Sequence, residues 1–346
     1  MTSDSPPSSR SPDSYARMAT PLLRSAWLLY STTVVSAVAV FLGVIAPGVR
    51  GVASDKVVSF WERLSNTWLD ASALLLIGLL VLGIYELLVE TRVVMAAKIA
   101  LMFGGAATVV AAAVSLVYPL APLITVILMM AVGLLAGVAG TLTLRATHTR
   151  AGGMVLLLLG LSGILRLIAW RFAVAGATDP GTYGIGRGFA TASVVFEGMA
   201  QAGTIAWVGV RGRWVGQLLT PLALALAFFL VWSAGQGRGE DAPQWKMALW
   251  GALGWVPPPE PYGLSTLSVF FGVSAPLLGL AALLAGRRQG PISAAVAIAV
   301  MARGLYDVPL RAMLLAAAAV WMVLAMVDDR VMWRALAAEK RASEER

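Results

Sequence analysis

Long apolar stretches follow one another along most of this chain, separated by short segments that are polar or contain glycine and proline. A helix of about 20 predominantly apolar residues can cross the hydrocarbon core of a bilayer. The pattern therefore predicts an all-α fold, a polytopic transmembrane helical bundle of about ten spans. Their expected ranges are 22–45, 71–89, 93–117, 122–144, 152–175, 188–210, 215–233, 264–286, 291–307 and 309–327.

The last two spans come from one apolar stretch, 291–327, which is interrupted by Tyr306-Asp307-Val308-Pro309. Proline removes a backbone donor and disfavours helix at the residue before it, so we divide the stretch there. With ten spans, more Lys and Arg residues lie on the side of the N-terminus than on the opposite side. Joining the last two spans reverses that bias. Because positive residues accumulate in cytoplasmic loops, we expect ten spans with both termini in the cytoplasm.

The polar ends of the chain divide it into three parts. Residues 1–20 are rich in Ser, Pro and Asp and predict a disordered cytoplasmic tail, 21–328 form the transmembrane bundle, and 329–346 form a charged cytoplasmic C-terminal tail. Two long loops, Asp55–Asp70 and Pro243–Trp255, carry apolar residues at helical spacing. We expect each to form a short helix that lies flat in the outer interface of the membrane.

The composition supports the membrane prediction and excludes several functions. Hydrophobic residues make up 59% of the chain and charged residues 13%, and the mean hydropathy is +0.80. The chain has no cysteine and one histidine, so it cannot build a disulfide, a thiolate metal site or a bis-histidine haem site. We expect no cofactor and no metal. The net charge of +8 reflects cytoplasmic Lys and Arg, so no nucleic-acid partner is expected.

A pair of opposite charges is predicted inside the apolar sequence. Arg166 lies nine residues before the end of the span 152–175, and Glu197 lies nine residues after the start of the span 188–210. At a rise of 1.5 Å per residue, both side chains are at the same depth, about 13 Å below the outer end of the hairpin. We expect them to form an ion pair, which Gln201 would extend by one helical turn. The pair is either a structural bridge or a substrate or proton site.

Two further groups of charges require explanation. Glu86 and Lys98 lie about one turn inside the cytoplasmic boundary of neighbouring spans, and we expect a structural pair there with the lysine reaching towards water. Arg303 and Asp307 are one helical turn apart before the break at residue 309, with Arg311 expected at the outer surface. This group is either part of a solute pathway or a charged turn between two short spans, because transporters use broken helices as binding sites.

Small residues at helical spacing in one span indicate close helix packing. Gly133, Gly137 and Gly140 follow one another within 122–144. Glycines at such spacing let two helix backbones approach closely. The contact is expected either inside the bundle, or with another copy of the chain or other membrane subunits. The lipid bilayer is the remaining expected partner.

These features support a transporter or permease-like protein for a small solute, with a polar strip at bilayer depth. Its pathway would be lined by Arg166, Glu197, Gln201, Arg303 and Asp307. The alternative is a structural or assembly subunit of a larger membrane complex, since the charges can neutralise one another. A membrane enzyme acting on lipid or isoprenoid chains is disfavoured because the acidic residues are scattered. The Ala/Gly/Arg-rich composition and the short loops indicate a bacterial inner membrane.

Overall fold

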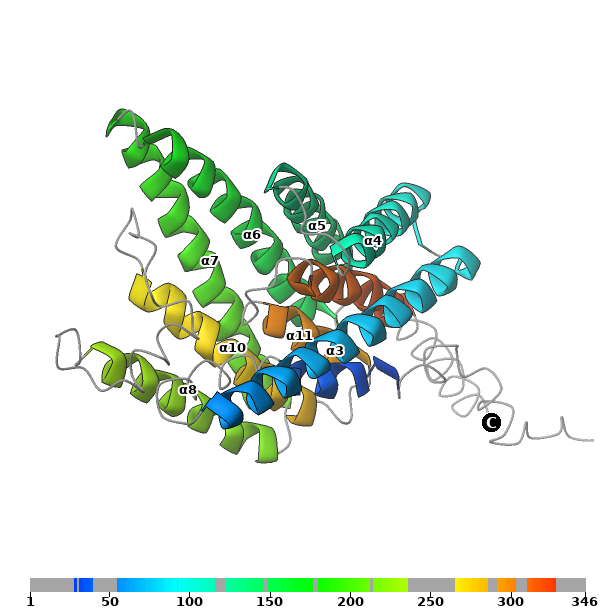
Figure 1. The fold of residues 1–346 in the computed structure, drawn as a ribbon. Coiled ribbons are helices and arrows are strands. Elements are labelled where there is room, and N and C mark those ends of the chain that lie inside the picture. The colour runs from blue at the N-terminus through cyan, green and yellow to red at the C-terminus, as the bar shows by residue number, and fades with distance from the viewer. Residues whose placement is uncertain are drawn as a thin grey trace, which may run out of the picture.

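The computed structural model of this protein describes residues 28–29, 31–39, 55–91, 93–115, 122–145, 149–176, 180–211, 214–235, 265–285, 291–302 and 310–327. Within these described parts, every regular element is a helix (Figure 1). The labelled helices are α3 (Asp55–Val89), α4 (Met95–Ser115), α5 (Pro122–Thr143), α6 (Arg150–Gly176), α7 (Pro180–Arg211), α8 (Trp214–Gly235), α10 (Ser265–Ala285) and α11 (Pro291–Met301). Residues 31–39 and 310–327 are helical as well.

Several of these helices are long and apolar enough to cross a membrane. Among the described residues there are five: Ser59–Val89, Met95–Val114, Val126–Thr143, Arg150–Phe172 and Leu310–Val327. Parts of α8, α10 and α11 are apolar but shorter. Apolar helices of this length indicate a membrane-embedded, all-α protein. A count of ten spans goes beyond these five and stays a prediction.

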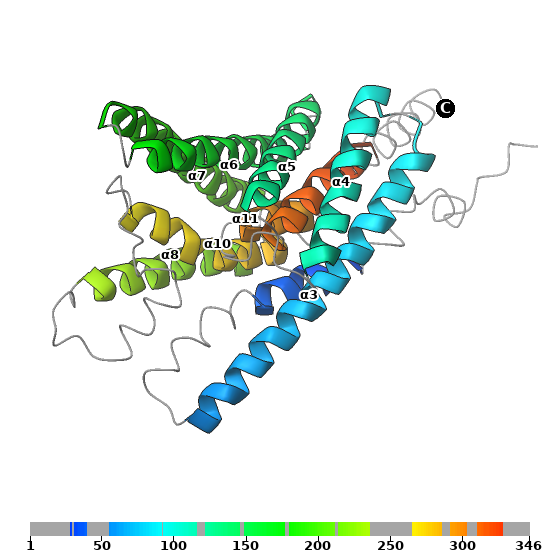
Figure 2. The ribbon, with the colours of Figure 1, turned by 45° about the horizontal axis from the view of Figure 1, so that its top comes forward.

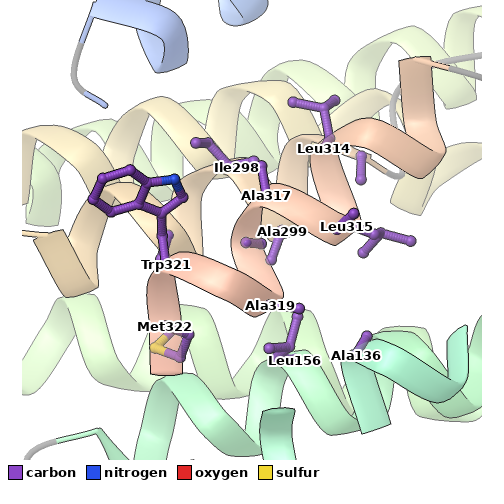
Figure 3. Close-up of a cluster of buried hydrophobic side chains, with 14 of the residues drawn as sticks. Ala136, Leu156, Ile298, Ala299, Leu314, Leu315, Ala317, Ala319, Trp321 and Met322 are labelled. Atoms are coloured by element: carbon purple, nitrogen blue, oxygen red, sulfur yellow. The ribbon is translucent and has the colours of Figure 1, made fainter. Parts of the chain in front are cut away.

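The helix over 310–327 lies at the centre of the bundle. Of its residues, 94% are buried inside the protein, and the residues of α11 that precede the break are buried as well. Figures 1 and 2 show this helix surrounded by α3, α4, α5 and α6. Its neighbours in the core include Leu156 on α6 and Ala136 on α5 (Figure 3). A helix that is apolar on all sides is expected in such an interior position.

The helix over 310–327 and α11 form an antiparallel hairpin. Gly152, near the start of α6, packs against Val296 of one helix and Met322 of the other. Ala302 directly follows the C-terminal end of α11, and Arg311 lies in the first turn of the helix over 310–327. Both line one cavity together with residues from the middle of α6. The end of α11 and the start of the helix over 310–327 therefore meet at half the length of α6. A hairpin also returns the chain to the side from which it came.

The predicted interfacial helix over 55–70 is not a separate element. Residues 55–70 continue directly into 71–89 as the single helix α3. The sequence contains no glycine or proline between residues 55 and 77, so nothing interrupts the helical hydrogen bonding there. The second predicted interfacial helix, 243–255, lies outside the described residues, as do the two terminal tails.

Glycines of α5 allow close packing within the chain, where α5 contacts α6. A Cβ atom on Gly140 would lie 2.7 Å from the backbone nitrogen of Leu157 and 2.8 Å from the carbonyl oxygen of Gly153. One on Gly133 would lie 2.8 Å from the side chain of Ile164. Close approach of two helix backbones explains these small residues. A Cβ on Gly137, by contrast, would meet nothing within 4 Å.

Two matched substitutions test this packing. Gly140→Ala forces a methyl group against backbone atoms of α6, which cannot rotate away, and we expect a loss of about 1–3 kcal/mol of stability. Gly137→Ala adds the same methyl group to the same helix in open space. It should leave the melting temperature unchanged or raise it slightly, because alanine favours helix over glycine. Melting temperatures in one detergent measure both, and equal values would contradict the α5–α6 contact.

Candidate functional site

The candidate site is built on the long hairpin of α6 and α7. The two helices run antiparallel, with Ser162 opposite Ser193 and the rings of Phe172 and Phe189 stacked at 5.7 Å nearer the turn. In this register Arg166 lies ten residues before the end of α6, whereas Glu197 lies seventeen residues after the start of α7, so the two positions are not at equal distance from the turn. The predicted equal depth is therefore wrong, because α7 begins eight residues before the expected start of the span at 188.

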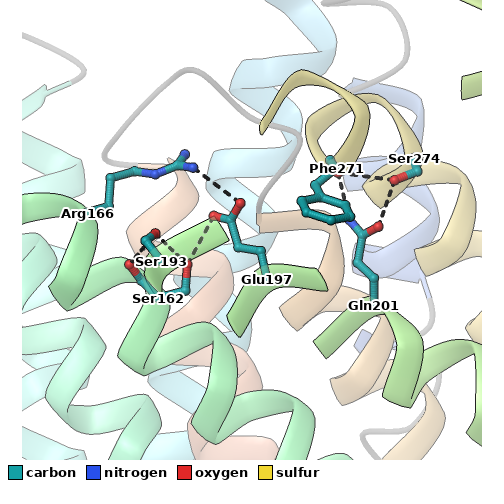
Figure 4. Close-up of polar contacts among 7 residues, drawn as sticks. All are labelled: Ser162, Arg166, Ser193, Glu197, Gln201, Phe271 and Ser274. Atoms are coloured by element: carbon teal, nitrogen blue, oxygen red, sulfur yellow. Dashed lines mark hydrogen bonds and ion pairs between the residues drawn. The ribbon is translucent and has the colours of Figure 1, made fainter. Parts of the chain in front are cut away.

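Arg166 and Glu197 form the predicted ion pair across this hairpin. The guanidinium Nη2 of Arg166 lies 3.2 Å from Oε2 of Glu197 (Figure 4). The glutamate side chain is 1% exposed, whereas the arginine is 30% exposed. The predicted contact is confirmed, and it is asymmetric. The carboxylate is inside the protein, while the arginine reaches its surface.

Two serines, absent from the sequence prediction, complete the surroundings of the carboxylate. The Ser162 hydroxyl donates to Oε1 of Glu197 at 3.1 Å, and the Ser193 hydroxyl donates to the Ser162 carbonyl oxygen at 3.0 Å. Each serine stands four residues before a charged residue, Ser162 before Arg166 and Ser193 before Glu197. Residues four apart share a helix face, and this spacing is the signal that identifies them in the sequence.

A small cavity adjoins the buried carboxylate. Its volume is about 10 Å³, room for about one water molecule. It lies where the α11 hairpin ends against α6 and α7. The cavity is lined by Leu159, Ser162, Glu197, Ala299, Ala302, Arg311 and Leu315.

The position of Arg311 corrects the sequence-based expectation. Arg311 was expected at the outer surface, after the break that ends the preceding span. It instead lines the cavity beside Glu197, in the first turn of the central helix. The reason is that the α11 hairpin ends at half the length of α6, so residues next to its break lie at the depth of the ion pair. Arg303 and Asp307 lie outside the described residues.

Gln201 belongs to a second polar contact, one turn further along α7. Its side-chain amide donates to the carbonyl oxygen of Phe271 at 2.7 Å and accepts from the Ser274 hydroxyl at 2.8 Å (Figure 4). Phe271 and Ser274 lie in α10, shortly before Pro276, where the missing backbone donor disturbs helical hydrogen bonding. The contact joins α7 to α10, so Gln201 points to a different neighbour from Glu197.

Lys98 is not paired with Glu86. Its ammonium group donates to the carbonyl oxygens of Leu88 at 2.6 Å and Glu90 at 3.0 Å. Leu88 lies in the last turn of α3 and Glu90 directly follows its end, where the last helical acceptors lack donors within the helix. A cation at a helix C-terminus is also favoured by the helix dipole. Lys98 therefore caps α3, a role that needs no carboxylate.

The site combines one buried carboxylate, two arginines and two hydroxyl groups at the meeting point of four helices. Within the described residues there is no group of three His, Asp or Glu side chains that could hold a metal ion. This chemistry can bind a charged or strongly polar small molecule by ion pairing and hydrogen bonding. The fold and the site define a helical membrane protein with a charged centre inside its bundle. No family model, curated protein or solved structure matches the chain.

Proposed function

We propose that this protein is a transporter or permease for a small solute, and that the charged centre of the bundle lies on the solute pathway. We further propose that it is a multi-pass protein of a bacterial inner membrane with both termini in the cytoplasm, and that the α11 hairpin enters the membrane and returns to the same side. The observation that carries the proposal is the Glu197 carboxylate. It is buried, adjoins a cavity, and contacts an arginine that reaches the surface.

Energetic considerations support this interpretation of the ion pair. A buried ion pair contributes little net stability, because removing two charges from water costs about as much as their attraction returns. Apolar side chains would hold two membrane helices together equally well. A carboxylate kept next to a polar cavity and at the ends of two broken helices is the arrangement that transporters use for binding. Arg166 is 30% exposed, and we take its side as the side from which the solute reaches the carboxylate.

A structural or assembly subunit is the second candidate function. It is favoured by the small size of the cavity, which has room for about one water molecule. It is also favoured by the extent to which the polar groups satisfy one another, since Glu197 accepts from Ser162 and Arg166. In that case the network would fix the α6–α7 hairpin and carry no solute.

Uptake into proteoliposomes tests the transport proposal. The full chain is reconstituted, and uptake of radiolabelled chloride, tetramethylammonium and mannitol is compared with protein-free liposomes. We expect uptake of one charge class, and we expect Glu197→Gln to lower it at least tenfold. The glutamine keeps an acceptor for Ser162 and a similar volume, so the fold should persist.

Asp70→Asn is the matched control for this measurement. It removes one carboxylate charge from an exposed position on α3, away from the cavity. Uptake by this variant should equal that of the unmodified protein. If the unmodified protein takes up none of the three solutes while it is folded, the subunit function replaces the transport proposal.

A further inference from the structure

The two halves of α10 are held in different ways. Pro276 lies inside the helix and cannot donate the backbone hydrogen bond that the carbonyl oxygen of Gly272 would accept. After the proline, a Cβ atom on Gly279 would lie 3.0 Å from a backbone carbonyl oxygen of α11, so this half packs closely on the core. Residues 281–283 are buried, whereas 270–272 are half-buried. Sharp bends of helices occur at such prolines, and α10 can therefore bend between its two halves.

The first half of α10 is held on α7 by one aromatic ring and one amide. A Cβ atom on Gly198 would lie 3.0 Å from Cζ of Phe271, so the ring packs on α7 at the residue that follows Glu197. The Gln201 side chain binds the carbonyl oxygen of Phe271 and the hydroxyl of Ser274 (Figure 4). Gly198 and Gln201 together form the seat of this half of α10.

This seat and Arg166 lie on opposite sides of the buried carboxylate. Arg166 is nearer the turn of the α6–α7 hairpin and is 30% exposed. Gln201 lies one helical turn beyond Glu197, away from the turn. With α10 on its seat, the Glu197 side chain is 1% exposed. A transporter that works by alternating access needs its site to open to each side in turn.

We propose that the residues of α10 before Gly272, which we call the gate segment, form a gate on the side of Glu197 that faces away from the hairpin turn. This inference rests on the proposed transport function and gives it a second access route. The hinge is formed by Gly272 and Pro276, and the latch consists of the two hydrogen bonds of Gln201. Opening lifts the Phe271 ring from α7 and lets water reach the carboxylate from this side.

The chemistry of the latch suits a gate that opens and closes. The gate segment contains no charged residue, so it opens without breaking an ion pair. Hydrogen bonds between neutral groups contribute little net stability, because water replaces them when they break. Gly272 has free space around it, since a Cβ atom there would meet nothing within 4 Å. Glycine is also the residue with the greatest backbone freedom.

Hydrogen–deuterium exchange of the full chain in detergent, measured by mass spectrometry, tests the hinge and the latch. Gln201→Leu keeps a similar volume and removes both hydrogen bonds, so amides of the gate segment should exchange roughly tenfold faster. Gly272→Ala restricts the hinge without a clash, so the same amides should exchange more slowly. Residues of α10 after Pro276 should be unchanged in both variants.

Two matched variants control for the substitutions themselves. Gln217 of α8 also donates to a backbone carbonyl of α7, that of Gly209 at 2.9 Å, but it is exposed. Gly78 of α3, like the hinge glycine, has nothing within 4 Å of an added Cβ atom. Gln217→Leu and Gly78→Ala should leave exchange in the gate segment unchanged. Gly272→Ala breaks no contact, so it tests the hinge even if Gln201→Leu folds poorly.

Carboxylate labelling measures whether the gate leads to Glu197. The folded protein is treated with a water-soluble carbodiimide and glycine ethyl ester, and the modified residues are located by peptide mass spectrometry. Asp70 is exposed and provides the internal reference rate. Relative to Asp70, Glu197 should react several times faster in Gln201→Leu and more slowly in Gly272→Ala.

The outcomes separate the gate from the transport proposal. If Gln201→Leu leaves exchange of the gate segment unchanged, or speeds it without faster labelling of Glu197, the gate is wrong. Solute uptake combined with either of these results would leave transport standing and overturn the gate. Faster exchange and faster labelling without uptake of any solute would support the gate segment as the cover of Glu197 and overturn transport.

Discussion

Replacing Glu197 by leucine is expected to remove most of the folded protein from the membrane. The change removes the carboxylate that pairs with Arg166 and lines one cavity with Arg311, and the Ser162 hydroxyl loses its carboxylate acceptor. Breaking a buried ion pair by removing one partner costs roughly 3–5 kcal/mol. That is a large part of the total stability of an ordinary protein domain, so a loss of folded yield follows.

The structure predicts that Arg166→Leu and Glu197→Leu lower the folded yield by different amounts. Arg166→Leu leaves Glu197 beside Arg311, so the carboxylate keeps a positive neighbour. Arg166 is also partly exposed, so its removal empties less of the interior. We expect Arg166→Leu to lower the yield clearly less than Glu197→Leu. The double substitution restores the net charge that the centre has in the unmodified protein and should recover much of the lost yield.

Monodisperse yield from solubilised membranes, measured by size-exclusion chromatography, gives this comparison directly. Arg171→Leu is the control for removing an exposed arginine from the same helix, and it should have little effect. A double variant that folds no better than Glu197→Leu would show that the two residues act independently. Such a result would contradict the ion pair as the source of the loss.

The contact between Arg166 and Glu197 could be predicted because both charges lie on neighbouring helices of one hairpin, although the equal depth expected for them is wrong. Ser162 faces Ser193, so Arg166 lies one helical turn nearer the turn of the hairpin and Glu197 one helical turn farther from it, and the two long side chains bridge this offset. The serines follow from the same geometry, since they stand one turn from the charges. Local spacing on two neighbouring helices therefore determines most of this part of the site.

Arg311 could not be placed in the same way. Its depth depends on how far the α11 hairpin reaches along α6, and this is set by packing between segments distant in sequence. Proline near a break is compatible with a turn at the membrane surface and with a turn inside the bundle. The burial of α11 and of the helix over 310–327 decides between these positions. The spacing of apolar residues along 291–327 does not show at which depth the turn lies.

Lys98 and α3 show how local competition changes a prediction. Backbone carbonyls at the end of α3 compete with the Glu86 carboxylate for the ammonium group, and the carbonyls are its acceptors in the structure. A hydrophobic pattern identifies amphipathic helix over 55–70, but it does not show whether that helix ends before the next one begins. Only a helix-breaking residue would separate them, and the sequence has none.

The central position of the helix over 310–327 leads to the second large expected effect, at Trp321. This side chain is 0% exposed, and its indole nitrogen donates to the carbonyl oxygen of Leu79 at 3.1 Å. Gly83 lies one turn after Leu79, and a Cβ on it would lie 3.2 Å from the indole nitrogen. The missing side chain of Gly83 therefore lets the indole ring reach the backbone of α3.

Trp321→Ala should lower stability by roughly 3–5 kcal/mol, because it leaves a large cavity in the centre of the bundle. Trp321→Phe fills most of that volume and loses mainly the hydrogen bond, so its cost should be lower and should include about 1 kcal/mol for that bond. Trp214 is 73% exposed, so Trp214→Ala controls for removing an indole from the surface. Melting temperatures in one detergent should fall in the order Trp214→Ala, Trp321→Phe and Trp321→Ala. If the melting temperature of Trp321→Ala equals that of the unmodified protein, the helix over 310–327 is not the core of this bundle.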